Sequence, residues 1–283
     1  MARTRKLFAA LTRRGRHQVL RGDLAFAGLP GIVYTPASGF NLPGVAFGHD
    51  WLTDVDHYVK TLEHLASWGI VAAAPDTERG LAPSVLNLAV DLGTTLDIIT
   101  GVRLGPGQIS VHPTKLGVAG HGFGGSAAVF AAAGLSGAGA TAPKAVAALF
   151  PSVTKPPAHQ PAAALKVPGL VLSAPDDPHS LRTDALDLAG AWKGSVLHIV
   201  SKAESAGLAE KRRFAGALGL PGSDRRTQKT ARALLTGFLL FHLTGDKDYR
   251  EFADPEALLP KTEPLDPEAP PVTTEEQIVA LLK

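Results

Sequence analysis

The sequence predicts an α/β fold with a mostly parallel central sheet and helices on both of its faces. Short β-branched or apolar runs alternate with helix-length amphipathic segments through the middle of the chain, a pattern typical of parallel strands joined by crossover helices. A chain of 283 residues, 45% of them hydrophobic and 19% charged, can bury one large core. A buried run, a glycine-dense turn and a small-residue helix also follow one another from Leu116 to Ala133.

Seven segments have the composition of buried strands. We expect strands at residues 31–34, 44–47, 70–74, 116–119, 145–150, 169–173 and 196–200. Helices are expected from a cap at Thr53 to a stop at Gly69, at 84–102, at 125–133, and at 230–243 with a stop at Gly245. A short helix is expected at 273–283. We find no internal repeat and no linker, so one domain is expected.

Both ends of the chain differ from the middle. We divide the chain into a basic leader (1–22), a folded domain (23–253) and a proline-rich acidic tail (254–283). The leader is basic with no acid before residue 17, and its apolar stretch at 7–11 is too short for a signal peptide or a membrane span. We expect a solvated leader in a cytoplasmic protein. The alternative is a peripheral contact with an anionic membrane through Arg3, Arg5, Lys6, Arg13, Arg14 and Arg16.

Overall charge and composition exclude some classes of partner. A net charge of +2 and a pI near 8.8 give no case for nucleic-acid binding. The absence of cysteine excludes disulfides and thiolate metal sites. His57 and His64 are too far apart on one helix to share a metal ion without outside ligands, so we expect neither a metal nor a cofactor.

The glycine-dense turn is the most informative motif. Gly120, His121, Phe123, Gly124 and Gly125 surround Gly122 in a strand–turn–helix context, where small residues allow the chain to turn sharply. Gly120, Gly122 and Gly125 also match the spacing of a dinucleotide-binding loop, but no acid follows at the required distance. We therefore favour glycines that serve the turn and its packing. Ser126 lies past the turn, and we expect it to pack or cap.

This turn and its surroundings resemble the α/β-hydrolases, in the branch that includes dienelactone hydrolases, plant chlorophyllases and bacterial polyester hydrolases, over roughly residues 33–252. The resemblance places Gly122 where the nucleophilic serine belongs. It implies an oxyanion hole formed by the amide of Asp50 or Trp51 and that of Phe123, with His121 and Gly124 beside it. It implies Asp177, or less favourably Asp176, as the catalytic acid. The loop expected to carry the catalytic histidine has Glu204 or Ser205 there instead.

Two of the three triad members are thus missing. Because Gly122 has no side chain, no acyl-enzyme can form at that position. Our first hypothesis is a catalytically silent α/β-hydrolase fold that keeps its pocket for a small acyl or ester-like ligand or for a protein partner. The second is a hydrolase or lyase in which Asp177 or Glu204 activates water. The third is a membrane-peripheral assembly factor docked through its basic N-terminus. The expected pocket is lined by Asp50, Trp51, Glu78, Arg79, Phe123, Asp177 and Glu204.

Overall fold

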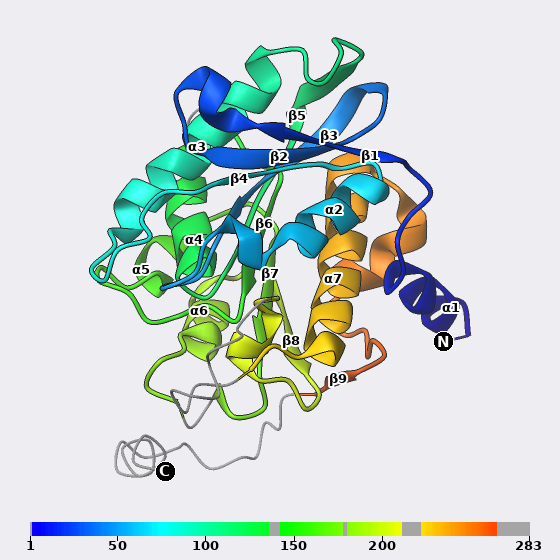
Figure 1. The fold of residues 1–283 in the computed structure, drawn as a ribbon. Helices are drawn as coiled ribbons and strands as arrows, with labels where there is room; N and C mark the ends of the chain where they lie inside the picture. Colours follow the sequence, from blue (N-terminus) through cyan, green and yellow to red (C-terminus); the bar gives the residue numbers. More distant parts are fainter. Residues whose placement is uncertain (1, 136–141, 178–179, 211–221, 265–283) are drawn as a thin grey trace.

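A computed structural model describes residues 2–135, 142–177, 180–210 and 222–264, and these build one nine-stranded sheet (Figure 1). The spatial order of the strands is β1-β2-β4-β3-β5-β6-β7-β8-β9. Neighbours from β4 through β3 to β8 are parallel, whereas β1, β2 and β9 pair in the antiparallel sense. The predicted α/β class with a mostly parallel sheet is therefore confirmed.

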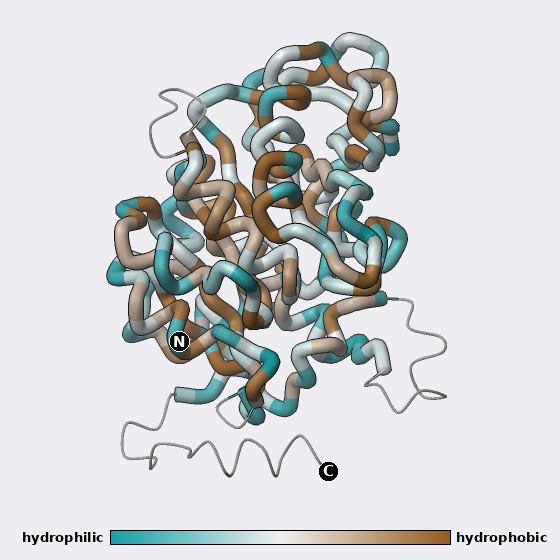
Figure 2. The backbone as a smooth tube through the Cα atoms, turned by 90° about the vertical axis from the view of Figure 1, so that its left-hand side faces the viewer, coloured by the Kyte–Doolittle hydropathy of each residue, from teal (hydrophilic) through white to brown (hydrophobic). Residues whose placement is uncertain are grey.

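Strands and α-helices alternate from β3 to α7, whereas β1, β2 and β3 follow one another with no α-helix between them. The strands are β1 (Val19–Asp23), β2 (Gly31–Pro36), β3 (Gly39–Gly48), β4 (Val71–Pro75), β5 (Ile109–His121), β6 (Ala145–Leu149), β7 (Gly169–Ser173), β8 (Ser195–Val200) and β9 (Thr262–Glu263). The α-helices are α1 (Ala2–Leu11), α2 (Val59–Ser67), α3 (Val85–Gly101), α4 (Phe123–Leu135), α5 (His159–Ala162), α6 (Ala185–Ala191) and α7 (Arg225–Leu239). The chain coloured by hydropathy lets the alternation of apolar and hydrophilic segments be followed (Figure 2).

Alternate strand residues feed two separate cores, one on each face of the sheet. In β3, Val45 and Phe47 join the core formed with α1, α2 and α7, while Ala46 joins the core formed with α3, α4 and α6. Figure 1 shows these two sets of helices on opposite sides of the strands. The period of two along each strand thus sorts the apolar side chains between the layers.

The predicted elements are mostly present, with boundaries that the local chemistry explains. Strand β7 has the predicted bounds, and Ser84 caps α3 through its side chain. Asp54, rather than Thr53, caps the first turn before α2, and a 3-10 turn (Val55–His57) precedes that helix. Helix α7 begins early because Asp224 caps it, and a π-helical turn carries it on to Gly245. The edge strand β1 was not predicted, because its residues are polar and mostly exposed.

The N-terminal segment is part of the folded body and not a solvated leader, so that prediction is wrong. Helix α1 buries Phe8 and Leu11 in the core against α7. Arg3 pairs with Asp248, and Arg14 pairs with Glu63. Near the other end, β9 pairs with β8 and Leu259 is buried, so the folded body also extends beyond residue 253. The helix predicted at 273–283 lies outside the described residues.

Among the described residues, no helix is both long and apolar enough to cross a membrane.

Candidate functional site

The carboxyl ends of the parallel strands meet at one edge of the sheet, and the predicted turn lies there. Strand β5 ends at His121, Gly122 has a φ of +53°, and α4 begins at Phe123. The Gly122 amide donates to the Leu149 carbonyl, so the turn is also fixed to β6. A Cβ on Gly124 would lie 2.3 Å from the Gly48 backbone, so only glycine lets α4 approach the end of β3 this closely.

A carboxylate occupies the space above this turn. Oδ1 of Asp50 accepts a 3.0 Å hydrogen bond from the Phe123 amide. A Cβ built on residue 122 would lie 2.0 Å from that same oxygen and 2.4 Å from the Asp50 Cγ. The side chain of a nucleophile at residue 122 would therefore overlap the Asp50 carboxylate. The Phe123 amide, predicted to bind an oxyanion, is bound to this carboxylate instead.

Backbone and side-chain hydrogen bonds hold the Asp50 loop in place. The Asp50 carbonyl accepts from the Thr53 amide at 3.2 Å and from the Thr53 hydroxyl at 2.7 Å. His49, buried beneath the loop, places one ring nitrogen 2.9 Å from the Asp50 carbonyl and the other 2.6 Å from the Thr77 carbonyl. The Asp50 amide donates to the Tyr58 hydroxyl at 3.1 Å. This amide therefore faces Tyr58 and not the space above Gly122.

Tyr58 and His121 connect this loop to the loop after β8. The Tyr58 hydroxyl lies 2.7 Å from His121 Nδ1, and His121 Nε2 lies 2.7 Å from the Ser205 carbonyl. Because a carbonyl only accepts, the Nε2 of His121 carries a proton. In the neutral ring Nδ1 then accepts from the Tyr58 hydroxyl, which in turn accepts from the Asp50 amide. The three hydrogen bonds form one directed chain across the buried side of the site. His121 is thus a buried residue that connects the two loops.

Asp177, the residue that the resemblance implies as the catalytic acid, lies in the turn that follows β7. Its Oδ2 accepts from the Ser173 hydroxyl at 2.9 Å and from the Ala174 amide at 2.7 Å. Its Oδ1 accepts from the Ser205 hydroxyl at 2.9 Å. Burial raises the pKa of the Asp177 carboxyl, although these hydrogen bonds act in the opposite direction. Each oxygen of Asp177 is therefore engaged inside the protein.

Ser205, and not Glu204, is the residue that meets the acid. The sequence left both open at the position of the missing histidine. Glu204 is exposed and precedes the 3-10 turn that begins at Ser205. A serine hydroxyl has no basic nitrogen, so it cannot take a proton from a nucleophile near neutral pH as an imidazole does.

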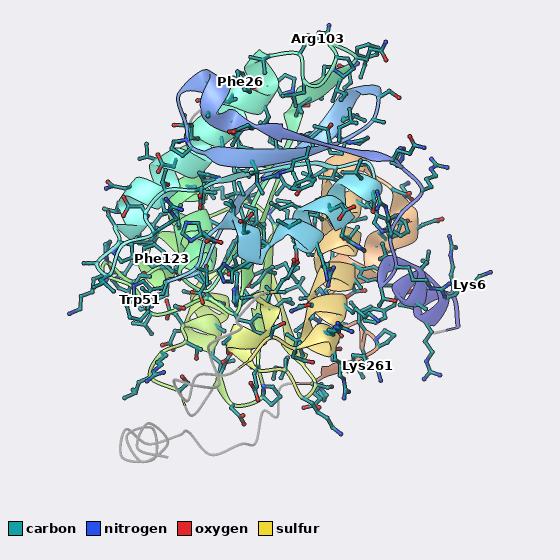
Figure 3. All side chains as sticks on the ribbon, in the orientation of Figure 1. Lys6, Phe26, Trp51, Arg103, Phe123 and Lys261 are labelled. Carbon is teal, nitrogen blue, oxygen red and sulfur yellow. The ribbon has the colours of Figure 1, made fainter. Side chains whose placement is uncertain are left out.

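The other predicted site residues have structural or surface positions. Ser126 is buried and donates to the Ser152 carbonyl at 2.6 Å. Glu78 accepts from the Ser84 amide and from Asn87 at the start of α3. Trp51 is 48% exposed, and its indole donates to the Leu81 carbonyl. Figure 3 labels Trp51 and Phe123 on the opposite side of the view from Lys6 of α1.

Backbone strain gathers at this edge of the sheet. Leu52, Glu78, Phe150 and Lys202 all have positive φ between 51° and 58°, and they follow β3, β4, β6 and β8, respectively. Such conformations cost roughly 1 to 2 kcal/mol per residue for side chains other than glycine. They cluster in proteins at functional sites, where the surroundings hold them in place. The strand ends that carry the candidate site are thus also where the chain is most strained.

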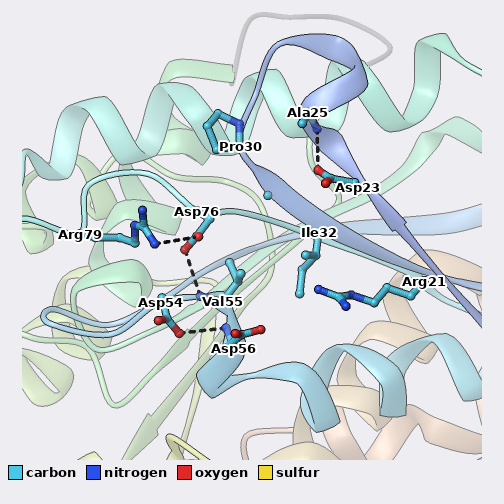
Figure 4. Close-up of a pocket in the computed structure, with 11 residues that line it drawn as sticks. Arg21, Asp23, Ala25, Pro30, Ile32, Asp54, Val55, Asp56, Asp76 and Arg79 are labelled. Carbon is cyan, nitrogen blue, oxygen red and sulfur yellow. Dashed lines mark hydrogen bonds and ion pairs between the residues drawn. The ribbon is translucent and has the colours of Figure 1, made fainter.

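A polar pocket of about 320 Å³ opens beside the site, between β2 and the turn after β3 (Figure 4). Its lining combines four carboxylates with two guanidinium groups; the lining residues are Arg21, Asp23, Ala25, Pro30, Gly31, Ile32, Asp54, Val55, Asp56, Asp76 and Arg79. Asp76 holds the Val55 amide and pairs with Arg79 at 3.2 Å. Of the residues expected to line a ligand pocket, only Arg79 lines this one.

A scan against protein-family models and a search of curated proteins both find no match to this chain.

Three features of the site carried no clear sequence signal. Tyr58 looks like an ordinary apolar helix position, and Ser205 looks like a loop serine. Asp50 was expected to contribute its amide, whereas its side chain makes the decisive contact. A signal was present in one respect, because an acid directly follows the Gly48-His49 pair at the end of a strand expected to border the oxyanion hole.

Proposed function

We propose that this protein uses an α/β-hydrolase-like scaffold for binding and does not perform serine-hydrolase catalysis. The observation that carries the proposal is the Asp50 carboxylate, which fills the space of a nucleophile at residue 122 and accepts the Phe123 amide. We include in this proposal that the scaffold is related to the branch of dienelactone hydrolases, chlorophyllases and polyester hydrolases. In this remodelled site the Asp50 carboxylate occupies the space of the nucleophile and accepts the hydrogen bond that a substrate oxyanion would accept.

Electrostatics support a silent site. Oxyanion holes accelerate acyl transfer because their amides stabilise the negative charge that develops on the substrate oxygen. Here a carboxylate already accepts the Phe123 amide, and an ionised Asp50 would repel a second negative charge at that point. The Ser205 hydroxyl beside Asp177 supplies no general base. Nucleophile, base and oxyanion stabilisation are therefore all missing from the same place.

An apolar rim supports binding as the remaining role. Trp51, Leu52 and Leu81 are 48%, 50% and 81% exposed. Trp51 and Leu81 are adjacent, since the Trp51 indole donates to the Leu81 carbonyl at 3.2 Å. Grouped exposed apolar side chains commonly mark binding surfaces. We propose that this rim binds a neutral acyl or ester-like ligand, because the adjacent carboxylate disfavours an anion.

The alternative of water activation by Asp177 and Glu204 has less geometric support. Both Asp177 oxygens are occupied by internal donors, and Glu204 is exposed beside Ser205. A base needs hydrogen-bond reach to its water, which these contacts do not favour. This alternative is tested in the same experiment as the silent site.

The experiment measures hydrolysis of 4-nitrophenyl acetate by the purified chain, beside Asp50→Asn, Asp177→Asn and Glu204→Gln. We expect all four proteins to show the same slow background and no labelling by a serine-directed fluorophosphonate. Turnover by the parent that is lost in Asp177→Asn and Glu204→Gln would instead establish the water-activating alternative. Labelling at any serine of this edge would overturn the silent site.

Binding is tested separately with methyl octanoate, followed by tryptophan fluorescence. We expect a saturable change in the parent that weakens at least about tenfold in Leu81→Asp, because a charge in the rim opposes an apolar ligand. Leu258→Asp is the matched control, since Leu258 is also an exposed leucine (69%) but lies outside the rim. Equal binding by both variants, or no saturable change in the parent, would contradict an acyl ligand at this rim.

Contact with an anionic membrane stays a prediction. Helix α1 buries Phe8 and Leu11 in the protein core, so its apolar face is not available for insertion into lipid. Arg5, Lys6 and Arg13 remain exposed, and any contact through them is electrostatic. Flotation with phosphatidylserine vesicles tests it: Arg5→Gln with Lys6→Gln should reduce flotation if this face docks, and equal flotation would argue against it.

A further inference from the structure

Two short helices bring three metal-binding side chains together away from the turn at Gly122. His159 begins α5, Asp184 precedes α6, and Asp187 lies in the first turn of α6. One potential ligand atom from each residue lies within 4.8 Å of the other two. His159 Nδ1 and Asp184 Oδ1 are 3.2 Å apart.

Asp184 gives the cluster an unusual feature. Its side chain is 4% exposed, and although the ring and backbone of His159 lie beside this carboxylate, no hydrogen bond that meets normal geometry reaches its Oδ2 among the described residues. A buried carboxylate oxygen without a partner is costly, and native proteins seldom leave one unless an ion or water meets it. His159 is partly exposed and Asp187 is exposed, so an ion can reach the group from solvent.

The spacing fits a shared ion. Two atoms that are each 2.0 to 2.1 Å from a tetrahedral metal lie about 3.3 Å apart. His159 Nδ1 and Asp184 Oδ1 are joined by a 3.2 Å hydrogen bond, a separation close to that value, so an ion could replace the shared proton with little movement, and the exposed Asp187 side chain can adjust by rotation. A set of one imidazole and two carboxylates suits Zn²⁺ and related transition metals better than Ca²⁺ or Mg²⁺, which prefer oxygen ligands alone.

We infer that His159, Asp184 and Asp187 form a binding site for a divalent transition metal of the Zn²⁺ type. Three protein ligands leave a further coordination position for water. The ion would fasten α5 to α6. Thr183, next to Asp184, donates its hydroxyl to the Asp177 carbonyl at 3.2 Å, so the ion would also steady the loop of the buried acid. This inference does not depend on the proposed function.

For the test, the full chain is first freed of metal with a chelator. It is then titrated with ZnCl₂, followed by calorimetry, and separately with Co²⁺, followed by visible absorption. We expect one ion per chain, a Co²⁺ spectrum that indicates nitrogen ligation, and a higher Tm with Zn²⁺. His159→Gln and Asp187→Asn should each weaken binding at least about tenfold. Asp97→Asn is the matched control, because Asp97 is an exposed helical aspartate outside the cluster.

Both test variants replace side chains that are not buried, so we expect them to fold, and circular dichroism checks this. No Zn²⁺ binding by the parent at concentrations up to about 1 mM would overturn the inference. Binding that is equally strong in the parent, His159→Gln and Asp187→Asn would also overturn it, because the ion would then bind elsewhere.

Discussion

The Asp50 carboxylate accepts the amide hydrogen of Phe123 at 3.0 Å, directly above Gly122. In a working serine hydrolase the amide after the nucleophile serves the oxyanion of the substrate. Here an internal side chain takes that hydrogen bond. The consequences for stability and reactivity can each be measured.

Gly122→Ser should destabilise the protein and leave it inactive. The new Cβ would lie 2.0 Å from Asp50 Oδ1, and residue 122 has a φ of +53°. We expect the free energy of unfolding in urea to fall by at least about 2 kcal/mol. Gly101→Ser is the control, because a Cβ there meets no atom within 4 Å. Adding Asp50→Ala to Gly122→Ser should recover part of the loss; purely additive effects would refute the predicted clash.

Tyr58→Phe should weaken the connection between the loops after β3 and β8. The change removes the acceptor of the Asp50 amide and the donor to His121 Nδ1 while keeping the ring. Leaving buried polar groups without partners costs about 1 to 3 kcal/mol, which urea unfolding can measure. Tyr249→Phe is a matched change at a half-buried ring that packs on Phe252. Equal stability of Tyr58→Phe and the parent would show that the hydrogen-bond chain contributes little.

Stability should fall as the pH drops from about 6.5 to about 4. Burial lowers the pKa of His198 to about 4, and burial together with the nearby Arg232 lowers the pKa of His64 to about 4. The unfolded chain then binds protons that the folded chain does not, so each histidine costs up to roughly 3 kcal/mol over this range. Burial raises the pKa of Asp177 and of Glu210, which opposes the trend because the folded state takes up those protons first.

The measurement is the midpoint of urea unfolding at several pH values in the parent and in His64→Gln with His198→Gln. The double variant should lose less stability between pH 6.5 and pH 4 than the parent. His17→Gln serves as control, since His17 is only partly buried. Identical pH profiles of the parent and the double variant would contradict this prediction.

Leu11→Ala should destabilise the whole protein. Leu11 is fully buried against the core in α1, and truncating a buried leucine costs about 2 to 5 kcal/mol. Lys6→Ala, on the exposed face of the same helix, should change stability by less than about 0.5 kcal/mol. Thermal unfolding compares both variants with the parent, and a Tm of Leu11→Ala equal to that of the parent would contradict a stabilising role of helix α1.

The strands were predictable because their residues are apolar on both faces. Each of the seven expected strands is present: six are parallel strands buried between two helical layers, and the antiparallel β2 is also buried along most of its length, so all seven show an apolar run. The edge strand β1 was not predictable from that pattern, because its Leu-Arg-Gly-Asp residues face solvent. Helix α1 was misjudged because its apolar stretch at 7–11 is short and flanked by basic residues, and only the long-range contact with α7 makes Phe8 and Leu11 core residues.

The sequence predicted where the backbone turns at the candidate site, but not which side chains meet there. The spacing of glycines from Gly120 to Gly125 located the turn, because close approach and positive φ leave few alternatives to glycine. The direction of the Asp50 side chain and the choice of Ser205 over Glu204 depend on rotamers and loop geometry across the sheet edge. The cluster of His159 with Asp184 spans two helices, so no local spacing in the sequence indicated it.

The claim that the Asp50 carboxylate occupies the place of a nucleophile is tested with the double variant Gly122→Ser/Ser205→His. This double variant is made in two backgrounds, one that retains Asp50 and one that carries Asp50→Ala. The measurement is covalent labelling by a fluorophosphonate, together with hydrolysis of 4-nitrophenyl acetate. If the Asp50 carboxylate occupies the place of the nucleophile, the introduced serine should react only in the Asp50→Ala background. Equal labelling in both backgrounds, or turnover by the unaltered chain, would contradict the account.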